Sequence, residues 1–72
     1  MPFELRNFPK GHDGMEFPHF MLWNIHKKKY YNKTFKTRDA AINMAKAAIK
    51  FRERKESKVV KKNGKTFILP VN

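Results

Sequence analysis

Lysine is the residue type whose number and distribution say most about the chemistry of this chain. The 72 residues include 17 Lys or Arg against six Asp or Glu, which gives a formal net charge of +11 at pH 7. Residues 27–66 carry fifteen Lys or Arg and only three acids, whereas residues 1–26 have a net charge of −1. This asymmetry indicates one basic surface, and phosphate backbones favour such a surface because each neutralised phosphate releases condensed counterions.

The candidate phosphate contacts lie at two predicted hairpin turns and along the outer side of a predicted helix. They are Lys27, Lys28, Lys29, Lys46, Lys50, Arg54, Lys58, Lys61, Lys62 and Lys65. Lysine outnumbers arginine by thirteen to four, and arginine makes most bidentate contacts to bases. We therefore expect a module that binds nucleic acid through its backbone with little sequence specificity, duplex DNA being the first expectation and RNA an open alternative.

Aromatic residues between the lysines provide a second candidate interaction, the stacking of bases. Tyr30 and Tyr31 follow three lysines directly, and strand alternation predicts that one points into the core and the other to solvent. The sequence does not say which of them is exposed. Trp23 is expected to fill the core, because a domain this small needs its large apolar side chains there.

No set of residues has the pattern of a catalytic site. The chain has no cysteine, and its one serine, Ser57, shows no paired base. Glu53 and Glu56 are one helical turn apart but surrounded by basic residues, which favours local ion pairs. The glycines stand apart, so no phosphate-binding glycine-rich loop is formed. We expect a protein that is not an enzyme and needs no cofactor.

A metal site is not expected either. His12 lies in a predicted loop, and His19 and His26 flank a predicted strand seven residues apart. A metal ion would need three or four such ligands on fixed elements. The three histidines are therefore interpreted as ordinary surface residues.

A membrane surface and an acidic protein are the other partner classes that a basic chain can bind. No apolar run approaches the roughly 18 residues that span a bilayer, and no signal peptide is recognisable, so we expect a cytoplasmic protein. The apolar side of the predicted helix, residues 41–49, is mostly alanine, whereas helices that lie on membranes carry bulky apolar residues. We therefore expect no membrane binding. An acidic surface of a host protein, as bound by small phage proteins, is the alternative to nucleic acid. In that case the apolar anchors would come from the N-terminal arm: Phe3, Leu5, Phe8 and Phe17. The oligomeric state stays open.

The predicted fold is α+β, in the order arm, two strands, helix, two strands. Residues 1–18 hold three prolines and form an irregular arm that packs on the domain of residues 19–72. The alternative is a mobile arm that becomes ordered on binding. Residues 19–26 and 30–36 form the first hairpin. Thr37 caps a helix that ends near Arg54 or Lys55, with an apolar stripe at helical spacing: Ala41, Ile42, Ala45, Ala48 and Ile49.

The second hairpin covers residues 58–69. Its Asn63-Gly64 pair is typical of a type I′ turn, whose two central residues need a positive φ. That turn places Val60 opposite Phe67 and Val59 opposite Ile68, and Pro70 ends the pairing. A small, mainly antiparallel sheet with one helix on one face follows from this order.

One pattern resembles known proteins. Trp23-Asn24-Ile25, a basic turn, then Phe35 and Thr37 running into Ala41 and Ala45 read W-x-[VI] and F-x-T-x-x-x-A-x-x-x-A before a Gly-containing hairpin. Over about residues 20–66 this resembles small bacterial and phage domains of unknown function. It is more distantly similar to the arm-type DNA-binding domains of phage integrases. That resemblance implies DNA contacts by a sheet in a groove, although those domains have three strands before the helix and no hairpin after it.

Overall fold

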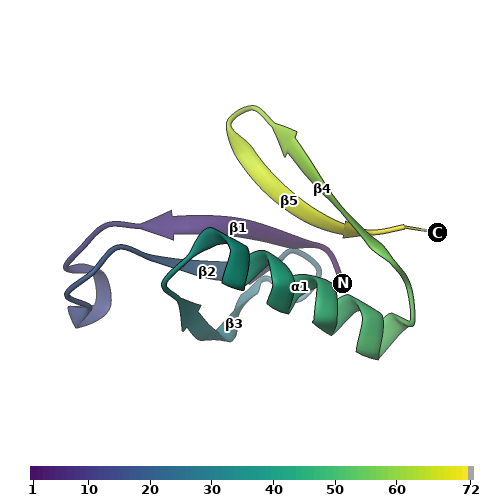
Figure 1. Cartoon of the computed structure of the whole chain (residues 1–72), viewed down its shortest axis with the longest axis horizontal. Coiled ribbons are helices and arrows are strands. Elements are labelled where there is room, and N and C mark those ends of the chain that lie inside the picture. Colours follow the sequence, from purple (N-terminus) through teal and green to yellow (C-terminus); the bar gives the residue numbers. More distant parts are fainter. Residues whose placement is uncertain (72) are drawn as a thin grey trace.

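The computed structural model describes residues 1–71, apart from the side chain of Asp13. Five antiparallel strands form one sheet in the order β3-β2-β1-β5-β4, and one helix packs on it (Figure 1). The predicted α+β class with two hairpins and one helix is confirmed. The elements are β1 (Phe3–Phe8), the 3-10 helix η1 (His12–Gly14), β2 (His19–Asn24), β3 (Lys29–Phe35), α1 (Arg38–Glu53), β4 (Ser57–Lys62) and β5 (Lys65–Pro70).

The N-terminal arm differs from its prediction as an irregular segment. Phe3–Phe8 form the central strand, which pairs with β2 on one side and with β5 on the other. The physical reason is a period of two: Phe3 and Leu5 alternate with Glu4 and Arg6, which gives one apolar face. The arm therefore does cover the core as expected, but it does so as the middle of the sheet.

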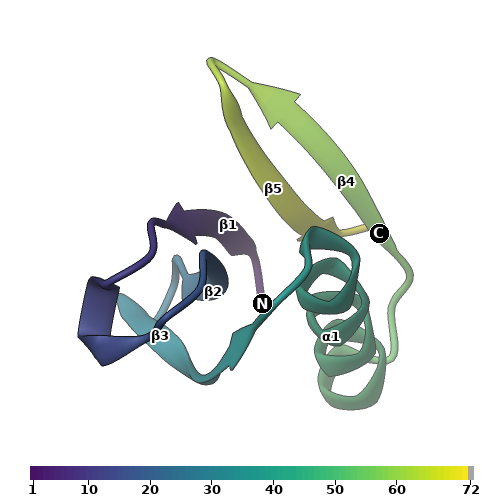
Figure 2. The same cartoon turned by 60° about the vertical axis from the view of Figure 1, so that its left-hand side comes forward.

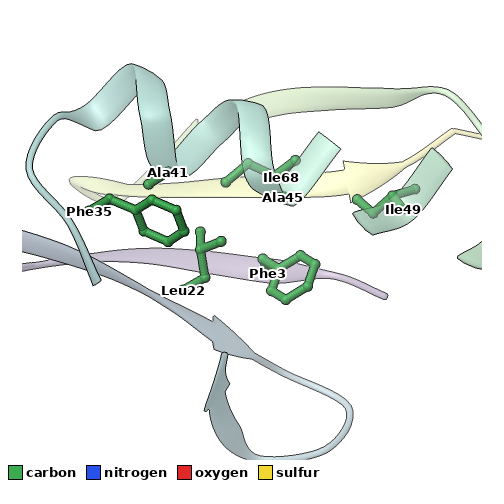
Figure 3. Close-up of a cluster of buried hydrophobic side chains, with 7 residues drawn as sticks. All are labelled: Phe3, Leu22, Phe35, Ala41, Ala45, Ile49 and Ile68. Atoms are coloured by element: carbon green, nitrogen blue, oxygen red, sulfur yellow. The ribbon is translucent and has the colours of Figure 1, made fainter. Parts of the chain in front are cut away.

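The core lies between α1 and the sheet (Figure 3). Ala41, Ala45 and Ile49 from α1 are fully buried, which confirms the predicted stripe, with Ile42 and Ala48 packed at its sides. The small alanine side chains let the helix backbone approach the strands closely. The strands contribute the remaining buried apolar residues: Phe3, Leu22, Phe35 and Ile68.

The helix begins and ends where its sequence signals place it. The backbone N–H of Ala40 donates to Thr37 Oγ1 at 3.1 Å, so the cap forms as predicted. Arg54 adopts a left-handed conformation with φ 55°, and its N–H donates to the Lys50 carbonyl at 2.9 Å. These two residues fix a helix of 16 residues.

The β4–β5 hairpin has the predicted turn and register. Asn63 and Gly64 have φ 53° and 77°, Val60 lies opposite Phe67, and Val59 lies opposite Ile68. Only three residue pairs join β5 to β1. The free end of the hairpin therefore stands away from β1–β3, as Figures 1 and 2 show.

Candidate nucleic-acid interface

The helix covers one face of the sheet, and we call the opposite face the uncovered face. Side chains alternate along a strand and residues in register share a face, so the pairing with buried Leu22 and Ile68 assigns the paired positions. One end of the uncovered face lies under the loop that joins β1 to β2, because His12 of that loop stacks on Phe8 and His19 is fully buried. The uncovered face comprises Glu4, Arg6, Phe8, His19, Met21, Trp23, Tyr30, Thr34, Lys58, Val60, Lys62, Lys65, Phe67 and Leu69.

One row of this face crosses all five strands and is mostly apolar. From β4 to β3 it consists of Val60, Phe67, Glu4, Trp23 and Tyr30. The four apolar or aromatic members of the row are all half-buried. An antiparallel sheet with one solvated face usually places polar residues there. This row is therefore unusual for the face of the sheet that α1 does not cover.

Arg6 lies at the aromatic end of that row. Its guanidinium carbon is 4.6 Å from the centre of the Trp23 ring and 5.6 Å from that of Tyr30. Arg6 Nη1 donates to the Tyr30 hydroxyl at 2.9 Å, while Nε and Nη2 donate to the Glu4 carboxylate at 3.1 and 3.4 Å. Trp23 and Tyr30 meet edge to face, with ring centres 4.9 Å apart. The guanidinium is thus held in a fixed place by partners on three neighbouring strands.

The same partners stabilise the charged form of Arg6. The hydrogen bonds to Glu4 and to Tyr30 raise the pKa of Arg6 above its ordinary value. Its side chain stays 36% exposed, whereas that of Glu4 is 13% exposed. A cation therefore faces solvent at this point of the sheet, with its counterion beneath it.

Two lysines continue the positive charge toward the free end of the hairpin. Lys62 and Lys65 lie opposite each other in register and both are exposed. Beside them, where β1 and β5 part, a groove of about 590 Å³ has Lys65, Arg6, Tyr30 and Arg38 among its lining residues. Arg38 Nη2 donates to Thr66 Oγ1 at 2.9 Å, so this cation also has a fixed position.

The predicted basic residues do not all share one surface. Lys58, Lys62 and Lys65 lie on the uncovered face, whereas Lys61 points to the side of the helix. Three others follow the solvent side of α1, across the helix from its buried stripe: Lys46, Lys50 and Arg54. The helix α1 lies on the covered side of the sheet (Figure 2), and these three exposed residues lie across it from the buried stripe, away from the uncovered face.

The third group lies at the β2–β3 turn. Lys27, Lys28 and Lys29 are exposed there, at the end of the sheet next to Met1. Lys27 and Lys29 line a pocket of about 460 Å³ together with Arg52 of the last helical turn. The structure thus divides the predicted contacts among the hairpin, the helix and this turn.

The two tyrosines separate as alternation requires. Tyr30 lies on the uncovered face, whereas Tyr31 packs on the core, with its ring 6.3 Å from that of Phe3 and its hydroxyl donating to Met44 Sδ at 3.7 Å. The expectation that Trp23 fills the core is wrong. Trp23 pairs in register with Glu4 and Tyr30 and therefore lies on the side away from the helix.

The interpretation of all three histidines as surface residues is also wrong. His26 is exposed, but His19 is fully buried under the loop that joins β1 to β2. Phe8 stacks on both His12 and His19, with ring centres 4.2 and 5.5 Å away. Among the side chains that the structure describes, no three His, Asp or Glu residues gather as a metal site would require.

Three residues of this surface were not predicted from the sequence: Arg6, Arg38 and Phe67. Arg6 was assigned to an irregular arm, although the alternation from Phe3 to Phe8 is the signal of a strand. Phe67 and Trp23 could not be assigned to the uncovered face without knowing which strand the arm supplies. The pairing of β1 with β2 and β5 is what brings these residues together.

Comparison with known proteins adds no relative: no protein-family model, no curated protein and no solved structure matches the chain. Within residues 1–71, the structure has no helix with the length and apolarity needed to cross a membrane.

Proposed function

We propose that this protein is a non-enzymatic module that binds nucleic acid, mainly through the phosphate backbone and with little sequence specificity. The observation that carries the proposal is the uncovered face itself, where the cations of Arg6, Lys62 and Lys65 lie beside a row of aromatic and apolar side chains. A polyanion whose bases offer flat π faces for stacking matches both properties of this face.

The net charge supports the same proposal. The chain carries +11, and a charge of this sign attracts a polyanion and speeds its association. Three strands precede α1, which is the order implied by the resemblance to integrase DNA-binding domains. The β4–β5 hairpin remains a departure from that resemblance.

The salt dependence of binding tests this proposal. If about five phosphates are neutralised, log affinity should fall with log salt at a slope near −4.5, which is roughly a 500-fold loss between 50 and 200 mM salt. Fluorescence anisotropy with labelled duplex and single-stranded 20-mers of mixed sequence measures this slope. Undetectable binding to both at 50 mM salt would overturn the proposal.

Two variants with equal charge loss locate the contacts. Replacing Lys58, Lys62 and Lys65 with Gln removes three charges from the uncovered face, and replacing Lys46, Lys50 and Arg54 with Gln removes three from the solvent side of α1. The first variant should flatten the slope by up to about 2.7, the second by less than about 0.9. Equal flattening by both would show that general charge, and not the uncovered face, attracts the nucleic acid.

The alternative partner is an acidic host protein, and two of the four apolar anchors expected for it are not accessible. Phe3 is buried in the core and Leu5 packs against it, so neither can anchor a partner. Phe51, 82% exposed on α1, is instead the apolar side chain most open to a protein contact. A pull-down from lysate with and without nuclease distinguishes a protein partner from nucleic acid. A protein that is still captured after nuclease treatment, and is no longer captured by Phe51→Ser, supports the acidic-protein alternative.

A further inference from the structure

The cluster of Arg6, Trp23 and Tyr30 has the chemistry of a platform for unpaired bases. Proteins that bind single strands combine cationic grooves with aromatic side chains or guanidinium planes on which bases stack. Here an indole, a phenol ring and a guanidinium meet within 5.6 Å, on the sheet face opposite α1. Bases inside a duplex already stack on one another, so they cannot use such a platform.

We propose that the Arg6–Trp23–Tyr30 cluster binds unpaired bases of single-stranded nucleic acid, while Lys62 and Lys65 hold the adjoining phosphates. This proposal rests on the proposed function and narrows it to one class of ligand. It assigns a binding role to residues outside the lysine groups.

The cluster is organised before any ligand arrives. Glu4 and Tyr30 accept three hydrogen bonds from Arg6, so its side chain loses little further freedom on binding. A guanidinium has five N–H donors, which leaves two for a base edge or a phosphate oxygen. Trp23 and Tyr30 are half-buried and held edge to face, so they also present fixed surfaces.

A structural role alone does not account for the composition of the row. Phe67 and Val60 extend the apolar surface from Trp23 to the edge of the sheet. None of these side chains belongs to the buried core, which forms on the other face. An apolar strip rimmed by cations is the surface expected of a binding site.

The lysines lie within reach of the same strand of nucleic acid. Lys65 is on β5, two strand positions from Trp23 on β2, and it lies two residues beyond Phe67, which is in the row of Trp23. The usual strand spacing and rise make this offset about 12 Å. A strand of a few nucleotides spans that distance, because successive phosphates rise about 3.4 Å along the axis even of a stacked strand. The groove lined by Arg6, Tyr30 and Lys65 joins the two areas.

The test compares a mixed-sequence single-stranded 20-mer with an abasic 20-mer of equal charge. The abasic strand keeps the phosphates and loses the bases, so the difference in affinity measures base contacts alone. The intact strand should bind at least about fivefold more tightly, the lower bound for one stacking contact. Equal affinity for both strands, with the salt slope retained, would overturn this inference while the proposed function stands. Binding to neither strand nor to duplex would overturn both.

Trp23 supplies an independent readout, because it is the one tryptophan in the sequence. Its fluorescence should change when the intact strand binds and stay constant with the abasic strand. No change with the intact strand at saturation would place the bases elsewhere and overturn the inference. This measurement uses the unaltered protein, so it does not depend on a variant that folds.

Variants then assign the residues. Arg6→Lys keeps the charge and removes the planar guanidinium, and Trp23→Leu keeps an apolar side chain and removes the ring. Each should lower affinity for the intact strand by about five- to 150-fold and leave the abasic strand unaffected. Phe51→Leu, which removes an exposed ring on α1, is the matched control and should change neither. An equal loss of affinity for the intact and the abasic 20-mer in Arg6→Lys would contradict a contact between Arg6 and a base.

Discussion

The two faces of the one sheet differ in what their side chains contact. On the covered face, Phe3, Leu22, Phe35 and Ile68 meet the alanine stripe of α1 and are buried. On the uncovered face, aromatic residues of similar size are half-buried and contact one another and Arg6. The same strands therefore build a core on one side and a surface with binding chemistry on the other.

The difference shows that composition alone does not locate a site in a chain this small. Ten aromatic residues could all have served a core that is marginal by size. The helix covers only one face, however, and its alanine side chains leave the core thin and closely packed. The surplus aromatic surface lies on the other face, next to the cations, where a ligand has access to it.

The largest expected effect is a difference in stability between variants of two adjacent β2 residues, one on each face of the sheet. Leu22→Ala should destabilise the protein by about 2–5 kcal/mol, because it leaves a cavity in the core. Met21→Ala, on the uncovered face, should cost about 1 kcal/mol, since its side chain is half-buried. Urea denaturation of the two variants measures the difference. Equal losses would mean that both faces of β2 are packed alike.

Much of the fold could be predicted from the sequence, because its signals are local. The Thr37 cap, the alanine stripe and the Asn63-Gly64 turn each fix a conformation through neighbours within a few residues, and all three are confirmed. The register of the β4–β5 hairpin follows from its turn alone. Residues 37–70 were therefore predictable almost completely.

The centre of the sheet could not be predicted in the same way. β1 joins β2 to β5, and its pairing with β5 links residues more than 60 positions apart. Pro2 and Pro9 suggested an irregular arm, but they flank the strand and do not interrupt it. Arg6 reaches Trp23 and Tyr30 through the pairing of β1 with β2 and of β2 with β3, so the cluster was not visible while the first residues were interpreted as an irregular arm.

A smaller difference in stability is expected between variants of the two adjacent tyrosines of β3, which lie on opposite faces of the sheet. Tyr30→Phe removes the hydroxyl that accepts from Arg6, and should cost about 0.5–1 kcal/mol of folding free energy. Tyr31→Phe removes only a weak contact to Met44 Sδ and should cost close to zero. Thermal unfolding of both variants checks this order. A larger loss for Tyr31→Phe would reverse the assignment of the two faces.

The smallest expected effect concerns the paired lysines of the hairpin. Lys62 and Lys65 lie directly opposite each other on the uncovered face, and like charges in that position destabilise a sheet. Lys65→Gln should therefore raise the free energy of unfolding by a few tenths of a kcal/mol at low salt, about the lower end of cross-strand pair energies. The gain should vanish near 1 M salt, where the Debye length falls to about 3 Å.

Urea denaturation at the two salt concentrations measures that gain, and Lys10→Gln, an exposed lysine in the β1–β2 loop, is the control with no like charge in register. If the rise in the free energy of unfolding appears together with weaker nucleic-acid binding, Lys65 lowers stability in the free protein and contributes a charge that the ligand neutralises. Lysines on an edge hairpin also prevent association between sheets, and that role predicts aggregation of Lys65→Gln without a change in affinity. A loss of stability at low salt would contradict the like-charge pair, because the two ammonium groups would then have to point apart.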